Sequence, residues 1–380
     1  MINNIQALRA FAAINVVFFH VIMISTSYGQ GVNIFAVFEG WGKNGVDLFF
    51  VISGFVMMHT QIKNKKSIGA FLKSRIIRIV PMYWLVTLFV ITLYLVFPSI
   101  FRSIVFEPTY ILSSFLFVSQ ISVDAKPILA VGWTLEWEVL FYIIFSLSLL
   151  LKNWRLVMLT IGLALVFVAI ITETWLIIEF FFGMVIAYVF NLKKINETNG
   201  FLIFGFGFIL LLLSINNINT FQIDRLIMWG VPSTFIVFGL LYARQTNSRV
   251  LIYLGDASYS IYIIHSSVLS VFYKLSLIYI SSLNYDFLAI ICLCGSVAFG
   301  CLTYSFIEKP SQQDAEKFLQ TGNYLFPEIT FRKLLYMLGG FWNPLEIKNA
   351  YLSRISRGGA EVLLTYVFLI SRGVSNPSKI

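Results

Sequence analysis

The sequence places ionisable side chains inside long apolar segments, where such residues are rare and costly. Arg9 and His20 share the first apolar segment, and Asp47 and Glu138 lie near the start of two later ones. The eleven positions from Arg9 to His20 amount to almost a whole number of helical turns. The two side chains therefore share one face, with His20 about 16 Å further along the axis. These four residues are the first candidates for chemistry.

His20 is the candidate general base. An imidazole accepts a proton near neutral pH, and a carboxylate beside it fixes its tautomer and stabilises its protonated form. Asp47 lies at a depth similar to that of His20, and Glu138 is expected to face the interior of the bundle. We therefore take both carboxylates as catalytic partners of His20. The structural alternatives are a histidine buried for packing alone and an aspartate that caps its own helix.

Two arginines that could bind a phosphate group follow the second apolar segment. Arg75 and Arg78 are three residues apart, on one side of a helical turn, and Pro81 is expected to open the next span. The forked donors of a guanidinium match the edge of a phosphate group. Together with Arg9 they are candidate ligands of an anionic cofactor. The alternative is that they only set the orientation of the chain in the membrane.

Aromatic and polar side chains supply the candidates for substrate binding. Tyr259, Tyr262 and His265 recur every three residues and form a polar stripe on an otherwise apolar helix. Trp133 opens the segment that contains Glu138, and its alternative role is in an aromatic belt at the membrane surface. We take Trp133, Tyr262 and His265 as candidate substrate-binding residues. The spacing of potential ligands predicts no metal site.

The composition requires that membrane helices position these residues. Of the 380 residues, 58% are hydrophobic and only 12% are charged, whereas soluble domains carry about 25% charged residues. This excludes a disordered chain, a secreted disulfide scaffold and a soluble enzyme with one membrane anchor. The net charge of +9 does not indicate nucleic-acid binding, because the basic residues cluster at the ends of apolar runs. We predict an all-α polytopic protein in a lipid bilayer.

Apolar runs and the residues that interrupt them predict a bundle of about ten transmembrane helices. Lysines and arginines are concentrated in the loops on the side of the N-terminus, which predicts that both termini are cytoplasmic. The stretch 109–119 is too short to span and is expected to be interfacial or re-entrant. Residues 1–310 form the predicted membrane domain and 311–380 a cytoplasmic tail of unknown role. The expected spans are roughly 5–26, 45–62, 80–100, 133–151, 156–172, 175–191, 200–216, 226–243, 258–280 and 287–307.

Six motifs between Ile5 and Pro310 resemble the acyltransferase 3 family of integral-membrane acyltransferases, most closely the branch that acetylates exopolysaccharides and O-antigens. Each motif alone is weak, whereas six in this order on a chain of about ten helices are specific. The motifs are Arg9-x10-His20, Gly45-Val-Asp47-Leu-Phe-Phe-Val-Ile-Ser53-Gly54, Arg75-x2-Arg78-x2-Pro81, Trp133-Thr-Leu-x2-Glu138-x2-Phe141-Tyr142, Ser258-Tyr-Ser-Ile-Tyr262-x2-His265 and Glu308-Lys-Pro310.

The resemblance implies transfer of an acyl group, usually acetyl from acetyl-CoA, to a carbohydrate hydroxyl at the inner membrane. His20 matches the essential histidine of the family and Arg9 its conserved partner, and Arg75 and Arg78 match arginines that engage the acyl-CoA. The acceptor is then a cell-surface polysaccharide or its lipid-linked sugar precursor. Direct transfer and an acyl-histidine intermediate both remain open. The alternatives are a secondary transporter or flippase of a lipid-linked sugar, or a membrane sensor or scaffold without chemistry.

Overall fold

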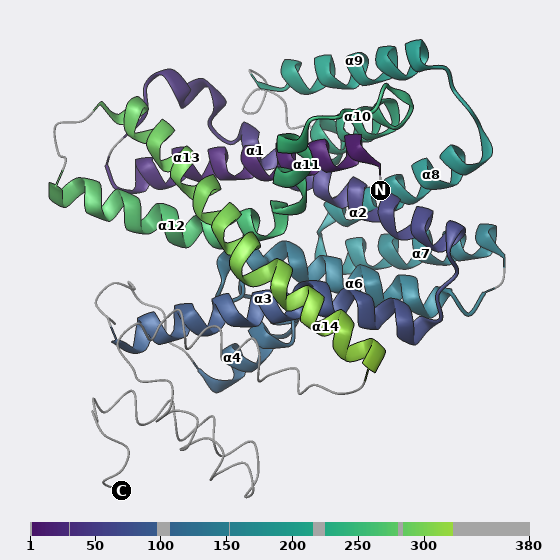
Figure 1. The fold of residues 1–380 in the computed structure, drawn as a ribbon, viewed down its shortest axis with the longest axis horizontal. Helices are drawn as coiled ribbons and strands as arrows, with labels where there is room; N and C mark the ends of the chain where they lie inside the picture. Colours follow the sequence, from purple (N-terminus) through teal and green to yellow (C-terminus); the bar gives the residue numbers. More distant parts are fainter. Residues whose placement is uncertain are drawn as a thin grey trace, which may run out of the picture. The chain divides into compact units, whose positions relative to one another are not determined.

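The computed structural model describes residues 2–29, 31–96, 107–151, 153–215, 225–279 and 284–321, and these ranges contain helices and no β-strand (Figure 1). The chain divides into two units. The first comprises residues 1–86 and 107–309, and the second residues 87–106 and 310–380. All the candidate site residues lie in the first unit. The all-α prediction is therefore confirmed over the part of the chain that is described.

Seven helical segments of the described ranges are long and apolar enough to cross a membrane, so the expected count of ten is not confirmed. Two further apolar helices, Glu197–Leu213 and Leu226–Tyr242, are shorter. The ninth expected span corresponds to α12, Ser258–Tyr279. The seven segments are Asn3–Ser27, Trp41–Lys63, Ile68–Val96, Ala130–Ser148, Trp154–Thr172, Trp175–Leu192 and Tyr285–Ala315.

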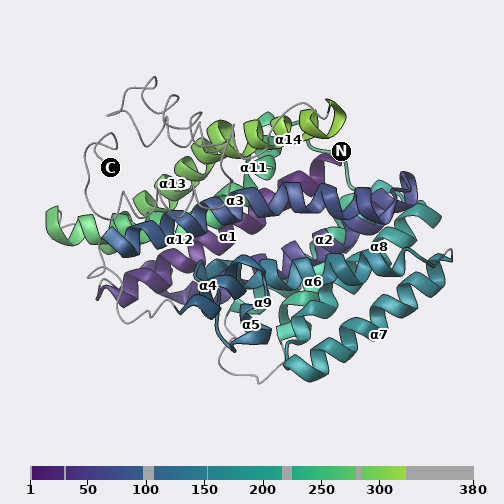
Figure 2. The same ribbon diagram turned by 90° about the horizontal axis from the view of Figure 1, so that it is seen from below.

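Helix α1 (Asn3–Ser27) contacts helices from both ends of the membrane domain. Its neighbours are α2 (Asn44–Lys63), α11 (Arg249–Asp256), α12 and α13 (Tyr285–Thr303) (Figure 1). Buried aliphatic side chains of α1, α12 and α13 form one apolar cluster. On another side of the unit α7 (Trp154–Thr172) packs against α6 and α8 (Figure 2). Helix α1 is thus held against segments that lie far apart in the sequence.

Glycines bring α2 and α8 (Ile178–Leu192) into backbone contact. A Cβ atom placed on Gly54 would lie 1.9 Å from the carbonyl oxygen of Phe180, and one placed on Gly183 would lie 2.0 Å from that of Val51. Small residues allow this approach, and van der Waals packing drives helix association in a membrane because lipid tails are as apolar as the side chains. The contact fixes α2, which carries the longest wall of the site.

Pro81 lies inside α3 (Ile68–Val96), and the expectation that it opens a membrane span is wrong. The helix begins thirteen residues earlier, at Ile68, because the preceding sequence is also apolar on one side and buries Phe71 and Ile79. Arg75 and Arg78 therefore lie within the helix rather than in a loop before it. Their guanidinium groups are positioned by regular helical backbone.

The stretch expected to be interfacial or re-entrant forms a short helix, α4 (Pro108–Phe115). Two side chains of α3 bind its C-terminal end. The hydroxyl of Tyr83 donates to the carbonyl oxygen of Ser114 at 3.1 Å, and Nε1 of Trp84 donates to that of Phe115 at 3.0 Å. Eight residues are too few to cross a bilayer, so the interfacial placement stays a prediction.

The predicted tail begins within α14 (Lys309–Thr321). Residues 322–380, which make up most of it, lie outside the described residues. The division into a membrane domain of residues 1–310 and a cytoplasmic tail of residues 311–380 stays a prediction.

Candidate active site

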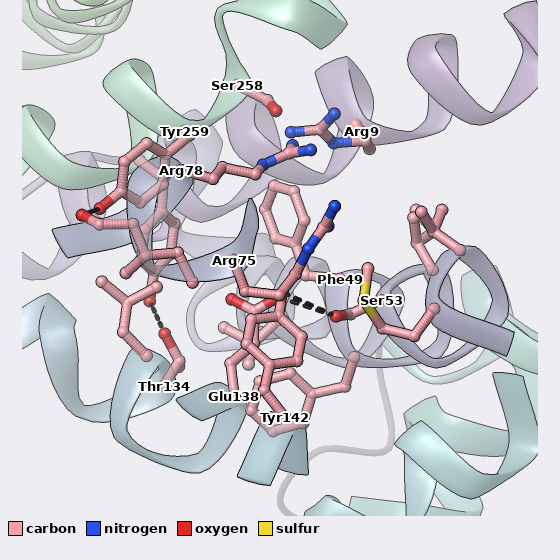
Figure 3. Close-up of a pocket in the computed structure, with 18 residues that line it drawn as sticks. Arg9, Phe49, Ser53, Arg75, Arg78, Thr134, Glu138, Tyr142, Ser258 and Tyr259 are labelled. Carbon is pink, nitrogen blue, oxygen red and sulfur yellow. Dashed lines mark hydrogen bonds between the residues drawn. The ribbon is translucent and has the colours of Figure 1, made fainter. Parts of the chain in front are cut away.

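A cavity opens between α1, α2, α3, α6 (Trp133–Ser148) and α12 (Figure 3). It encloses about 770 Å³ of space, a figure that includes its open mouth. Its wall follows α2 from Val46 to Met57, a distance of about 16 Å along a helix axis. The cavity is therefore elongated enough to hold a long, narrow ligand.

Three arginines from two helices line this cavity. Arg9 comes from α1, and Arg75 and Arg78 come from α3 (Figure 3). Nη1 of Arg9 donates to Oε1 of Gln6 at 3.0 Å, and the Arg75 guanidinium lies 5.9 Å from the ring centre of Phe71. The structure brings together the three arginines that the sequence singled out. Their combined charge favours an anionic ligand at this end of the cavity.

Glu138, from α6, is the fourth charged residue of the cavity wall. Its Oε1 accepts hydrogen bonds from Oγ of Ser53 at 2.7 Å and from the hydroxyl of Tyr142 at 2.5 Å. Its charge acts on Arg9 and Arg75. The prediction that Glu138 faces the interior is confirmed. Among the described contacts, however, it serves the arginine end of the cavity rather than the histidine that we expected it to orient.

Ser258 is a residue of the cavity wall that sequence reasoning did not assign. Its side chain is fully buried, and no partner for its hydroxyl occurs within the described ranges. Figure 3 shows it beside Arg9, at the first turn of α12. A buried hydroxyl without a partner costs about 1–3 kcal/mol, and a ligand in the cavity would remove that cost. The available signal was its place at the start of the motif Ser258-Tyr-Ser-Ile-Tyr262-x2-His265.

The two intramembrane histidines face each other. The rings of His20 and His265 lie with their centres 4.7 Å apart and their planes at 66°. Nδ1 of His20 is 2.9 Å from the carbonyl oxygen of Val16, and Nδ1 of His265 is 2.6 Å from that of Tyr262. Because a carbonyl oxygen only accepts, Nδ1 carries the hydrogen in each neutral ring and the lone pair lies on Nε2. The backbone therefore does the orienting that we had expected of a carboxylate.

Asp47 is fully buried, but its partner is Arg225. Nη2 of Arg225 donates to Oδ2 of Asp47 at 2.8 Å, and Nε lies 3.1 Å from Oδ1. This is the one ion pair among the residues that the structure describes. The expected contact between Asp47 and His20 is therefore wrong, because an arginine from the segment before α10 (Val231–Tyr242) neutralises the carboxylate. A catalytic role for Asp47 stays a prediction.

The aromatic candidates separate in the structure. Tyr262 lines the cavity, with its hydroxyl 2.7 Å from Oγ1 of Thr134 and donating to the carbonyl oxygen of Val131 at 2.9 Å. Trp133 is half-buried at the start of α6, outside the cavity wall, and its carbonyl oxygen accepts from Nε2 of Gln120 at 2.8 Å. Only Tyr262 is placed to contact a ligand in the cavity. It also connects the cavity to His265, one turn further along α12.

The sequence is similar to a known protein family and to a protein of known name. The family model described as "Acyltransferase domain" matches residues 2–305, a range that includes every candidate site residue. Exopolysaccharide production protein ExoZ of Rhizobium meliloti (strain 1021) is 34% identical over 258 residues, which is 62% of this chain and 79% of that protein. No solved structure matches. The chain therefore belongs to the acyltransferase 3 family and is a multi-pass membrane acyltransferase that transfers groups other than aminoacyl groups.

Proposed function

We propose that this protein moves an acetyl group from acetyl-CoA to a hydroxyl of an exopolysaccharide or of its lipid-linked sugar precursor. The observation that supports acetyl-CoA as the donor is that Arg9, Arg75 and Arg78 line one elongated cavity. The acceptor is supported by the similarity to a protein named for exopolysaccharide production.

Coenzyme A suits the cavity in charge and in shape. Its phosphates match the three guanidinium groups, and its pantetheine arm is long and narrow. Arg75 and Arg78 supply forked donors, and Ser258 adds a buried hydroxyl beside Arg9. In this proposal the arm extends along α2 toward Tyr262. The cavity wall includes neither His20 nor His265, and the ring of His265 lies 5.9 Å from that of Tyr262, centre to centre.

His20 is the proposed general base. The acceptor hydroxyl gives its proton to Nε2 of His20 while its oxygen attacks the carbonyl carbon of the thioester. The carbon–sulfur bond then breaks, and the thiolate of coenzyme A takes the proton back from His20. The hydrogen bond from Nδ1 to the Val16 carbonyl oxygen supports this role, because it leaves the lone pair on Nε2. General base catalysis of this kind contributes about 10²–10⁴ in rate.

The proposal also orients the protein in the inner membrane. Acetyl-CoA is a cytoplasmic donor, so the arginine end of the cavity faces the cytoplasm and both termini lie on that side. The excess of lysine and arginine in the corresponding loops supports this orientation. A reporter fused after Lys66 should read cytoplasmic and one fused after Lys126 periplasmic. The reverse pattern would overturn the orientation.

The function is tested by acetyl transfer in inverted membrane vesicles that contain the protein and its native polysaccharide. Labelled acetyl-CoA should label the polysaccharide with wild-type protein, and His20→Ala should abolish labelling at an unchanged level of folded protein. His59→Ala is the matched control, because His59 lies away from the cavity and contacts Asn191. Substantial turnover by His20→Ala would remove His20 from the reaction. Failure of the wild type to transfer acetyl would overturn the proposed function.

A further inference from the structure

His265 is a fully buried histidine whose Nε2 atom makes no hydrogen bond to the residues that the structure describes. Its side chain is 0% exposed, and within the described ranges its Nε2 has no hydrogen-bond partner. Its Nδ1 is already bound to the Tyr262 carbonyl oxygen, so Nε2 carries the free lone pair. A buried acceptor of this kind is unfavourable unless a donor reaches it. The ring against which it packs is that of His20.

Nε2 of His20 becomes a hydrogen-bond donor only after it has accepted a proton as a base. In its neutral form, Nδ1 carries the one ring hydrogen and is bound to the Val16 carbonyl oxygen. Once Nε2 has taken the proton of the acceptor hydroxyl, it becomes a charged N–H donor beside a ring that offers a lone pair. Hydrogen bonds to charged groups are roughly twice as strong as those between neutral groups.

The contacts of the His20 ring leave no carboxylate to stabilise its protonated form. Among the described contacts, its partners are the Val16 carbonyl oxygen and the rings of Phe19 and His265. The carboxylate that usually stabilises a catalytic imidazolium is engaged elsewhere, because Asp47 pairs with Arg225. A second imidazole is then the neighbour that can accept the new N–H.

We propose that His265 is the positioning residue of the base, whose Nε2 accepts a hydrogen bond from the proton that His20 gains in the transfer step. The proposal rests on the proposed function. The proton moves from the acceptor hydroxyl to Nε2 of His20, is held between the two rings, and leaves with the thiolate of coenzyme A. His265 undergoes no net change and bonds to neither substrate.

The test compares two replacements of His265 in the full-length protein in vesicles. His265→Leu fills much of the same space without an acceptor, whereas His265→Gln offers a carbonyl oxygen near the former Nε2. For His265→Leu we expect kcat per folded protein to fall about ten- to a hundredfold, the loss of one hydrogen bond to a charged group, with the KM for acetyl-CoA unchanged. His265→Gln should recover most of that loss. His59→Leu serves as the control, with kcat unchanged.

The outcomes distinguish a positioning role of His265 from a packing role. If His265 is only a packing residue, His265→Leu will keep the wild-type kcat per folded protein, or His265→Gln will be as slow as His265→Leu, and the proposal is overturned while acetyl transfer by the wild type stands. If His265→Leu does not fold, the decision falls to His265→Gln, whose kcat must stay within a few-fold of wild type. A wild type without acetyl transfer would overturn the proposed function and the positioning role together.

Discussion

The ion pair between Asp47 and Arg225 allows the structural role of a candidate catalytic residue to be separated from its chemical role. Asp47 is 0% exposed, whereas Arg225 is 28% exposed. Replacing Arg225 with Ala strands a fully buried carboxylate. Replacing Asp47 with Ala leaves a guanidinium that can turn toward water. We therefore expect Arg225→Ala to be much more destabilising than Asp47→Ala.

The magnitude follows from the burial of the pair. Removing one partner of a buried ion pair costs about 3–5 kcal/mol, a large part of the roughly 5–15 kcal/mol that holds a typical domain folded. Since about 1.4 kcal/mol is a factor of ten, the folded-to-unfolded ratio should fall by two to three and a half orders of magnitude. The double variant Asp47→Ala, Arg225→Ala buries no charge and should recover most of the loss.

The measurement is the thermal stability of the detergent-solubilised protein, followed by size-exclusion chromatography after heating, for the wild type, both single variants and the double variant. Wild-type stability of Arg225→Ala, or a double variant less stable than Arg225→Ala, would refute the reasoning. Activity then decides the second question. Acetyl transfer by the stable double variant would exclude Asp47 from catalysis, whereas a stable but inactive double variant would return Asp47 to the reaction.

Two further predictions concern the cavity and the helix contact. Arg75→Ala and Arg78→Ala should each raise the KM for acetyl-CoA about ten- to a hundredfold, as expected for a lost charge-assisted phosphate contact, and Arg→Lys should restore it only in part. Steady-state kinetics in vesicles measure this, and an unchanged KM would contradict the phosphate contact. Gly183→Ala should lower the yield of folded protein, because its Cβ would meet the Val51 carbonyl oxygen. The control Gly205→Ala has free space within 4 Å and should gain about 0.5–1 kcal/mol; equal yields would contradict the close contact.

Features that depend on one helix could be predicted from the sequence. The spacing of Arg75 and Arg78 predicted that they share one side of a helical turn, and both line the cavity. Arg9 lines it as well, whereas His20, predicted on the same face of α1, does not. Glu136 and Glu138 show the limit, because the sequence gives two carboxylates on one helix but not their neighbours. In the structure Glu136 accepts the backbone N–H groups of residues 119 and 120, at 3.0 Å each, whereas Glu138 lines the cavity.

Partners from distant segments could not be predicted. Asp47 and Arg225 are 178 residues apart, and nothing local to Asp47 indicates that an arginine rather than His20 lies beside it. The pairing of His20 with His265 likewise depends on the contact between α1 and α12. The tautomer of His20 was accessible in principle, because its partner Val16 is one turn away on the same helix.

The dependence of α1 on late segments has a consequence for biosynthesis. The helix that carries Arg9 and His20 leaves the ribosome first, yet it packs against α11, α12 and α13, which are made more than two hundred residues later. Chains usually fold from the N-terminus as they are made, so α1 must wait in the membrane without these partners. A nascent chain that stops before residue 265 contains no histidine pair. The contact between the rings of His20 and His265 therefore forms only once nearly the whole membrane domain has been made.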